Sequence, residues 1–255
     1  MRPFSLLIKP SGSDCNLDCE YCFYKNRCAE VGRGRQRMSD EVLEKLVADY
    51  TALGFSPAGF SWQGGEPTLM GVDFYKKAVE LQKKYAKPDQ QISNSFQTNA
   101  VLFDDAWCEF FADNDFLVGI SIDGPKELHD HYRKDHAGGG TFDRVMASIK
   151  KCQEYDVQYN TLTLINRKTA EYPERIFDFL VENGVQYLQF IPCLETNPAT
   201  GEVAEFSVTP EQYGDFLCRL FDHWYEYGPT RVSIRDFDSI VSYYVTGNHT
   251  ICTFG

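Results

Sequence analysis

The stretch "SDCNLDCEYCFYK", residues 13–25, places Cys15, Cys19 and Cys22 close together, with three and then two residues between them. Cysteines that lie this close together usually bind a metal or form disulfides. The whole chain has nine cysteines in 255 residues, an odd number in a chain too long for a small disulfide-bonded scaffold. The pattern therefore indicates metal or redox chemistry. For most of the other cysteines we expect the role of small buried apolar residues.

Two kinds of metal site compete for the three cysteines. A zinc site usually takes four ligands, often from paired clusters. This chain has no second Cys-x-x-Cys pair, and His129 and His131 are distant in sequence. A [4Fe–4S] cluster also usually takes four thiolates, so three would leave one iron open to a small molecule. The sequence favours such a cluster, with zinc as the alternative.

Composition and charge exclude several classes of protein. Hydrophobic residues make up 43% of the chain, enough for a sizeable core. The net charge is −12 and no long basic run is present, which argues against nucleic acid as a partner. No apolar run approaches the length of a membrane helix, and the apolar part of "MRPFSLLIKPSG" is too short for a signal peptide. We expect a cytoplasmic protein that does not bind a membrane.

Outward from the cysteines, strand-like and helix-like segments alternate along the chain. The expected strands are residues 4–9, 58–63, 91–98, 116–122, 157–165 and 185–191. The expected helices are residues 40–53, 72–86, 104–113, 141–154, 173–183 and 209–227. Alternation of this kind predicts an α/β fold with a parallel sheet, either a partial (β/α)6 barrel or a doubly wound open sheet. In both, functional residues gather at the carboxyl ends of the strands, where the cysteine loop lies.

A second motif, "WQGGEPTL" at residues 62–69, ends the second expected strand. Gly64 and Gly65 can bring backbone groups close to a ligand, and Glu66 can accept hydrogen bonds from an ammonium group. An ordinary turn is the alternative. The later strand ends "QTNA" (97–100) and "ISIDGP" (120–125) contain good turn formers in any case.

Together these motifs resemble those of the radical S-adenosylmethionine (SAM) superfamily. In that superfamily the open iron binds the amino and carboxylate groups of SAM, and the reduced cluster cleaves SAM to a 5′-deoxyadenosyl radical. The resemblance implies the fold, a partial (β/α)6 barrel of the radical SAM type, and a [4Fe–4S] cluster on the three cysteines. It also implies SAM-binding roles for Tyr21, Gly64, Gly65, Glu66, Ser121, Arg133 and Leu194. Among these, the glycines and Glu66 match the motif for the SAM amino group, Ser121 a ribose or carboxylate contact, Arg133 a partner of the SAM carboxylate, and Leu194 an adenine contact.

Over nearly its whole length the chain resembles one subgroup, the anaerobic sulfatase-maturating enzymes. These enzymes oxidise a Cys or Ser of a sulfatase to Cα-formylglycine. The resemblance implies two partners: a sulfatase polypeptide with a Cys/Ser-x-Pro/Ala-x-Arg motif, and an electron donor such as flavodoxin or ferredoxin. An acidic surface would suit the arginine of that motif.

The subgroup continues into a C-terminal domain with auxiliary [4Fe–4S] clusters and an aspartate proposed as the general base. The resemblance therefore implies a radical SAM core over residues 1–230 and, over residues 231–255, the incomplete start of this SPASM-type domain. Cys252 falls where the first auxiliary ligand is expected, and the base is expected beyond Gly255. We expect the 255-residue chain alone not to convert a sulfatase peptide.

Two alternatives share part of this pattern. One is another peptide-modifying radical SAM enzyme, for example one that forms a thioether. The other is an iron–sulfur regulator without catalysis, which would need the three cysteines but not the remaining motifs together.

Overall fold

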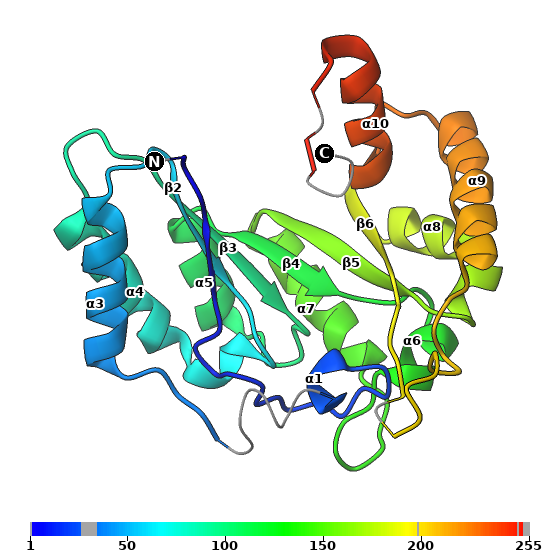
Figure 1. The fold of residues 1–255 in the computed structure, drawn as a ribbon, viewed down its shortest axis with the longest axis horizontal. Helices are drawn as coiled ribbons and strands as arrows, with labels where there is room; N and C mark the ends of the chain where they lie inside the picture. Colours follow the sequence, from blue (N-terminus) through cyan, green and yellow to red (C-terminus); the bar gives the residue numbers. More distant parts are fainter. Residues whose placement is uncertain (1, 27–34, 198, 249, 252–255) are drawn as a thin grey trace. The chain divides into compact units, whose positions relative to one another are not determined.

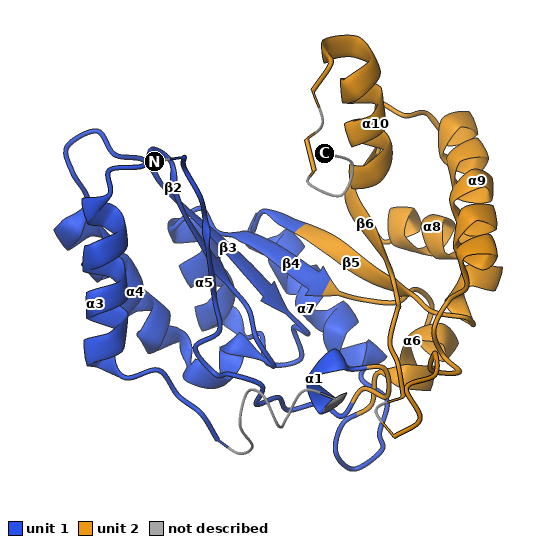
Figure 2. Ribbon diagram, in the orientation of Figure 1, with its two compact units in different colours: residues 1–18, 22–120, 135–159 blue, residues 19–21, 121–134, 160–255 orange. Residues whose placement is uncertain are grey.

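The computed structural model describes residues 2–26, 35–197, 199–248 and 250–251. The chain divides into two compact units (Figure 2). The first unit comprises residues 1–18, 22–120 and 135–159, and the second comprises residues 19–21, 121–134 and 160–255.

Seven strands in the described residues join one sheet in the order β1 to β7, which is also their order in the chain. They are β1 (Leu6–Ile8), β2 (Ala58–Trp62), β3 (Ile92–Thr98), β4 (Leu117–Ser121), β5 (Tyr159–Ile165), β6 (Tyr187–Pro192) and β7 (Ser233–Ile234). A doubly wound sheet reverses its strand order at a switch point. The order found here has no reversal, so the α/β fold follows the barrel-like alternative predicted from the sequence.

Helices connect the strands (Figure 1). The described α-helices are α1 (Phe23–Asn26), α3 (Asp40–Ala52), α4 (Val72–Tyr85), α5 (Asp105–Asp113), α6 (Lys126–Tyr132), α7 (Phe142–Glu154), α8 (Pro173–Glu182), α9 (Pro210–Tyr227) and α10 (Arg235–Thr246). Two 3₁₀ helices, η1 (Pro67–Met70) and η2 (Thr169–Glu171), follow strand ends. All six strands and six helices expected from the sequence are found, with ends that differ by at most two residues.

In the first unit, β1 to β4 pair in parallel, with Leu6 opposite Phe60 and Phe60 opposite Asn94. Helix α3 begins after Ser39, whose hydroxyl accepts a hydrogen bond from the Val42 N–H at 3.3 Å. Such a cap satisfies one of the unpaired N–H groups at a helix start. The helix ends before Gly54, which has a φ of 74° that glycine adopts without strain.

Large aromatic side chains fill the core of the first unit. Trp62 and Phe96 from neighbouring strands both pack edge-on against Tyr75 of α4, with ring centroids 5.4 and 5.0 Å apart. Phe111 of α5 lies 5.0 Å from Phe96. All four rings are almost fully buried, and edge-to-face pairs of this kind stabilise a core beyond the area they bury. The core holds the strands whose carboxyl ends carry the candidate site.

In the second unit, β5, β6 and β7 pair in parallel, and α9 begins with a capping box between Thr209 and Gln212. The segment 231–247, which the sequence did not assign, forms β7 and α10. Strand β7 pairs with β6, with Leu188 opposite Ile234. Residues 233–246 therefore belong to the second unit, and the expected domain boundary at residue 230 stays a prediction.

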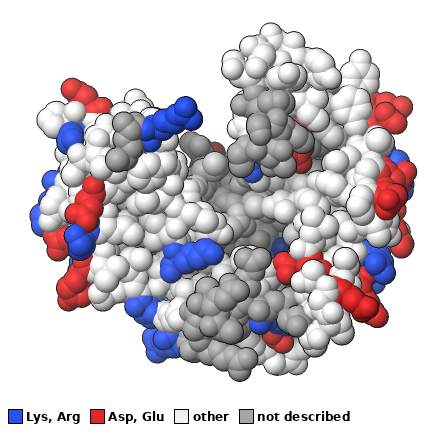
Figure 3. Space-filling view, in the orientation of Figure 1, with Lys and Arg blue, Asp and Glu red and all other residues white. Residues whose placement is uncertain are grey.

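Lysines and carboxylates pair with each other on two helices of the first unit. On α3 and α4, Lys45, Lys77 and Lys84 pair with carboxylates at 2.5–2.8 Å, so both signs of charge mix on this surface (Figure 3). Within the described parts of the chain, no helix combines the length and apolar character that crossing a membrane requires.

Candidate active site

The three clustered cysteines follow β1, and the structure shows them as thiols and not as disulfides. Cys19 is buried, and Cys15 and Cys22 are partly exposed. In the described residues, no three His, Cys, Asp or Glu side chains converge to hold a single metal ion. A cubane cluster binds each thiolate to a different iron, so three thiols from one loop suit it without converging on one point.

The remaining cysteines largely behave as expected. Cys108, Cys152 and Cys193 are buried, as predicted for small apolar residues. Cys218 on α9 is exposed, contrary to that expectation. Cys28 and the predicted auxiliary ligand Cys252 lie outside the described residues.

The glycine motif packs directly on the cysteine loop. The Gly65 N–H donates to the Gly12 carbonyl at 2.9 Å, and the Glu66 N–H donates to the Asp14 carbonyl at 2.8 Å. A Cβ at Gly65 would lie 2.2 Å from the Asp14 oxygen, and one at Gly64 would lie 2.8 Å from the Gly12 oxygen. Both positions therefore require glycine because backbone meets backbone there. Their contact with SAM stays a prediction.

Glu66 holds two strand ends together with its carboxylate. Oε1 accepts hydrogen bonds from the Thr68 N–H (2.9 Å), the Thr68 hydroxyl (2.7 Å) and the Thr98 hydroxyl (2.8 Å). Oε2 accepts from the Asn99 N–H at 2.8 Å. Burial raises the pKa of Glu66, and the hydrogen bonds from Asn99 and Thr68 oppose that rise. The carboxylate thus ties η1 to the end of β3, and its predicted contact with the SAM ammonium group stays a prediction.

Asn99 connects the Glu66 carboxylate to the cysteine loop. Its Nδ2 lies 3.7 Å from Cys15 Sγ and donates to Asn16 Oδ1 at 2.8 Å. Its Oδ1 accepts from the Val101 N–H at 3.1 Å, which is the turn-forming role expected of "QTNA". The contact with Cys15, 84 residues away in sequence, was missed because no local pattern indicates it.

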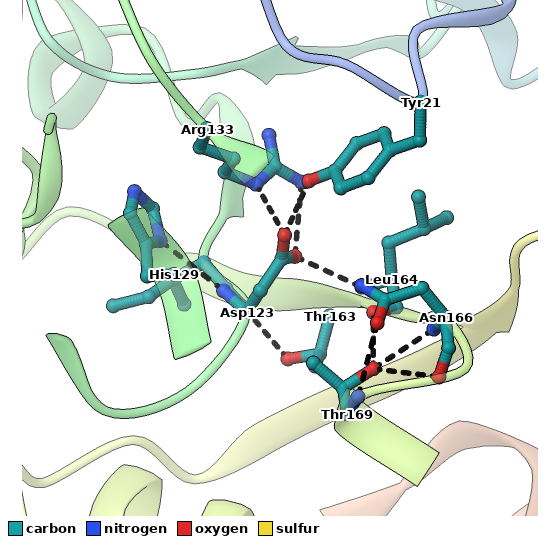
Figure 4. A network of polar contacts seen from close by, with 9 residues as sticks. Tyr21, Asp123, His129, Arg133, Thr163, Leu164, Asn166 and Thr169 are labelled. Atoms are coloured by element: carbon teal, nitrogen blue, oxygen red, sulfur yellow. Dashed lines mark hydrogen bonds and ion pairs between the residues drawn. The ribbon is translucent and has the colours of Figure 1, made fainter. Parts of the chain in front are cut away.

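In the second unit, Asp123 lies at the centre of a buried polar network (Figure 4). Arg133 donates to both carboxylate oxygens, from Nε at 2.9 Å and from Nη2 at 3.1 Å. The Tyr21 hydroxyl donates to Oδ2, and the Leu164 N–H donates to Oδ1 at 3.0 Å. The Arg133 guanidinium also lies 5.5 Å from the centre of the Tyr21 ring, within the range of a cation–π contact. The network brings together two predicted SAM-binding residues, Tyr21 and Arg133.

The charges of this network are set by burial and by one another. Burial alone would raise the pKa of Asp123, but the positive charge and hydrogen bonds of Arg133 hold it below its ordinary value. Burial would lower the pKa of Arg133, and Asp123 raises it instead. Burial raises the pKa of Tyr21. The network therefore contains an ionised carboxylate, a charged guanidinium and a neutral phenol near pH 7.

Asp123 was missed as a functional residue because "DGP" was interpreted as a turn. The available signal was a carboxylate at a strand end followed ten residues later by an arginine. The sequence predicted that Arg133 pairs with the SAM carboxylate. In the structure Arg133 pairs with the carboxylate of Asp123. Its contact with SAM stays a prediction.

His129 completes the network as a neutral acceptor. Its Nδ1 lies 3.3 Å from the Asp123 backbone nitrogen and accepts that N–H, which assigns the ring proton to Nε2. The side chain is fully buried. Burial, followed by the positive charge of Arg133, lowers its pKa to about 4. His129 therefore supports the Asp123 turn and carries no charge near pH 7.

Two further predicted residues lie at the ends of strands β4 and β6. Ser121 is the last residue of β4 and is partly exposed. Leu194 follows β6 and is 66% exposed, which leaves its side chain accessible to a ligand. Their contacts with SAM stay predictions.

The chain belongs to the radical SAM superfamily, since residues 10–180 match that family. Its relatives include anaerobic sulfatase-maturating enzymes. It is 39% identical to the serine-type enzyme of Bacteroides thetaiotaomicron over 99% of this chain and 64% of that protein. It is 40% identical to the cysteine-type enzyme of Clostridium perfringens over 99% of this chain and 69% of that protein.

Solved structures agree with this assignment. Native anSMEcpe with bound AdoMet and a Cp18Cys peptide superposes with a TM-score of 0.90 at 40% identity, covering 98% of this chain and 68% of that one. Streptococcus suis SuiB shares the fold, with a TM-score of 0.68 at 19% identity. The resemblance and fold inferred from the sequence are confirmed, and the superfamily's cofactors are the predicted [4Fe–4S] cluster and SAM. The chain spans about two thirds of the length of the curated relatives that it matches.

Proposed function

We propose that this chain is the SAM-cleaving part of an enzyme that oxidises a Cys or Ser of a sulfatase to Cα-formylglycine. The proposal rests on the cysteine loop, whose backbone accepts hydrogen bonds from the backbone N–H groups of Gly65 and Glu66. The chain that carries this loop is about 40% identical to sulfatase-maturating enzymes over almost its whole length. Cys15, Cys19 and Cys22 would hold the cluster, which would supply the electron for reductive cleavage of SAM.

The residues around the loop would bind and orient SAM. We assign the amino group to Gly64, Gly65 and Glu66 and the carboxylate to Arg133. The buried ion pair with Asp123 supports this role of Arg133, because it keeps the guanidinium charged and fixes its orientation before ligand arrives.

Three further residues complete the proposed SAM site. We assign Ser121 to the ribose or carboxylate and Leu194 to the adenine. Tyr21 would act near Arg133, through its cation–π contact and its hydrogen bond to Asp123.

The reaction on substrate balances as a two-electron oxidation. One hydrogen atom would leave the substrate Cβ for the 5′-deoxyadenosyl group of SAM, a second electron would then pass to an iron–sulfur cluster, and a proton would pass to a base or to water. Serine then yields the aldehyde directly. Cysteine yields a thioaldehyde, which water converts to the aldehyde with release of hydrogen sulfide. We propose that the peptide carries the Cys/Ser-x-Pro/Ala-x-Arg motif, that flavodoxin or ferredoxin supplies the electron, and that the reaction takes place in the cytoplasm.

Mass spectrometry of a sulfatase-derived peptide tests this proposal. The longest natural form of the protein is incubated without oxygen with SAM, a reductant and a peptide that carries the motif. We expect formylglycine at the target residue, and none in a control peptide with alanine at that position. A thioether, or an unmodified peptide together with intact SAM, would contradict the proposal.

A further inference from the structure

The Cys15 sulfur receives two N–H donors from its own unit. The Leu17 N–H lies 3.4 Å from Sγ, and the Asn99 Nδ2 lies 3.7 Å from it. The first donor comes from the cysteine loop itself, and the second comes from the end of β3. Asn99 is 8% exposed, so the second donor acts in a largely water-excluded place where a dipole has a strong effect.

The orientation of the Asn99 amide is determined by its other contacts. Oδ1 accepts the Val101 N–H at 3.1 Å, and Nδ2 donates to Asn16 Oδ1 at 2.8 Å. A flipped amide would turn an N–H₂ group toward the Val101 N–H and an oxygen toward the Asn16 oxygen, and would lose both bonds. The backbone of Asn99 is held by Glu66 at 2.8 Å. The donor therefore faces the sulfur because of the surrounding structure.

N–H donors to a cluster-ligating sulfur stabilise the reduced cluster more than the oxidised one, because reduction adds negative charge to the sulfurs. We propose that Asn99 is a positioning residue that raises the reduction potential of the cluster through its contact with Cys15. This inference rests on the proposed function, since it requires the cluster on Cys15. It gives Asn99 a role apart from binding SAM.

The test is a redox titration of the cluster, followed by electron paramagnetic resonance (EPR) without SAM. Asn99→Asp keeps the oxygen that accepts the Val101 N–H and replaces the donor with a carboxylate. Asn99→Leu removes the donor without adding charge. Thr98→Val is the neighbouring control, because it removes the hydroxyl that donates to Glu66 and accepts the Ala100 N–H but does not change the Asn99 side chain itself.

We expect both Asn99 variants to bind the cluster at a lower midpoint potential, with Asn99→Asp the lower of the two. A tenfold loss in the equilibrium constant of one-electron reduction corresponds to about 59 mV. Thr98→Val should keep the wild-type potential. An unchanged potential in both Asn99 variants would overturn the inference, and so would loss of iron from both of them while Thr98→Val keeps it. Absence of a cluster from the wild-type protein would instead refute the proposed function.

Discussion

Arg133 and Asp123 form a buried two-point ion pair, with Nε–Oδ2 and Nη2–Oδ1 distances of 2.9 and 3.1 Å. The Asp123 side chain is fully buried and that of Arg133 is 11% exposed. In such surroundings neither charge can be hydrated if its partner is lost. The pair therefore couples the stability of the second unit to the proposed SAM site.

Asp123→Asn should destabilise the protein strongly, because it leaves the Arg133 charge buried without a counter-charge. Breaking a buried pair in this way costs about 3–5 kcal/mol. Urea unfolding measures the loss. Combining Asp123→Asn with Arg133→Met should recover much of it, since both charges are then gone. As a control, Asp49→Asn, which breaks an exposed pair with Lys45, should leave stability nearly unchanged. Equal effects of the two Asp→Asn changes would contradict this account.

Gly65→Ala should reduce both cluster content and stability, since its Cβ would lie 2.2 Å from the Asp14 carbonyl oxygen. The cysteine loop must move to relieve this contact. Iron analysis after anaerobic reconstitution and a thermal melt measure the two effects. Gly214→Ala in α9 is the matched control, because an added Cβ there would meet no atom within 4 Å apart from the nearby backbone of its own helix. It should raise stability by about 0.5–1 kcal/mol. Full iron content in Gly65→Ala would show that the close contact is not required.

Stability should fall as the pH decreases from about 6.5 to about 4, in part through His129. The pKa of His129 is about 4 in the folded protein and 6.5 in the unfolded chain. Between these two values the unfolded chain is protonated at His129 and the folded protein is not, so unfolding takes up a proton. The contribution present above pH 6.5 is about 3 kcal/mol and is lost through this window. His129→Gln offers an acceptor to the Asp123 N–H but does not titrate. The difference in unfolding free energy between wild type and variant should therefore change across the window, and a constant difference would refute the assignment.

The sequence predicted elements wherever local chemistry marks their ends. Ser39 and Gly54 frame α3, and Pro173 begins α8. Helices α1, α6 and α10 were missed. Helices α1 and α6 have only four and seven residues, and Ile234, which precedes α10, is not a capping residue. Strand β7 has only two residues, too few for a periodic pattern.

In the candidate site, too, the sequence predicted the local motifs but not the contacts between distant residues. The cysteine spacing and the Gly-Gly-Glu motif lie within short stretches, and both could be identified directly. The contacts between Asn99 and Cys15 and between Tyr21 and Asp123 join residues 84 and 102 positions apart. Only the paired strands bring such residues together, so no local pattern predicts them.

The most direct test of the central claim is the EPR spectrum of the anaerobically reconstituted, reduced chain, recorded with and without SAM. We expect about four irons per chain and a cubane signal that changes when SAM is added. Cys22→Ala should abolish both the signal and the change. Zinc in place of iron, or a cluster whose spectrum SAM leaves unchanged, would contradict the account.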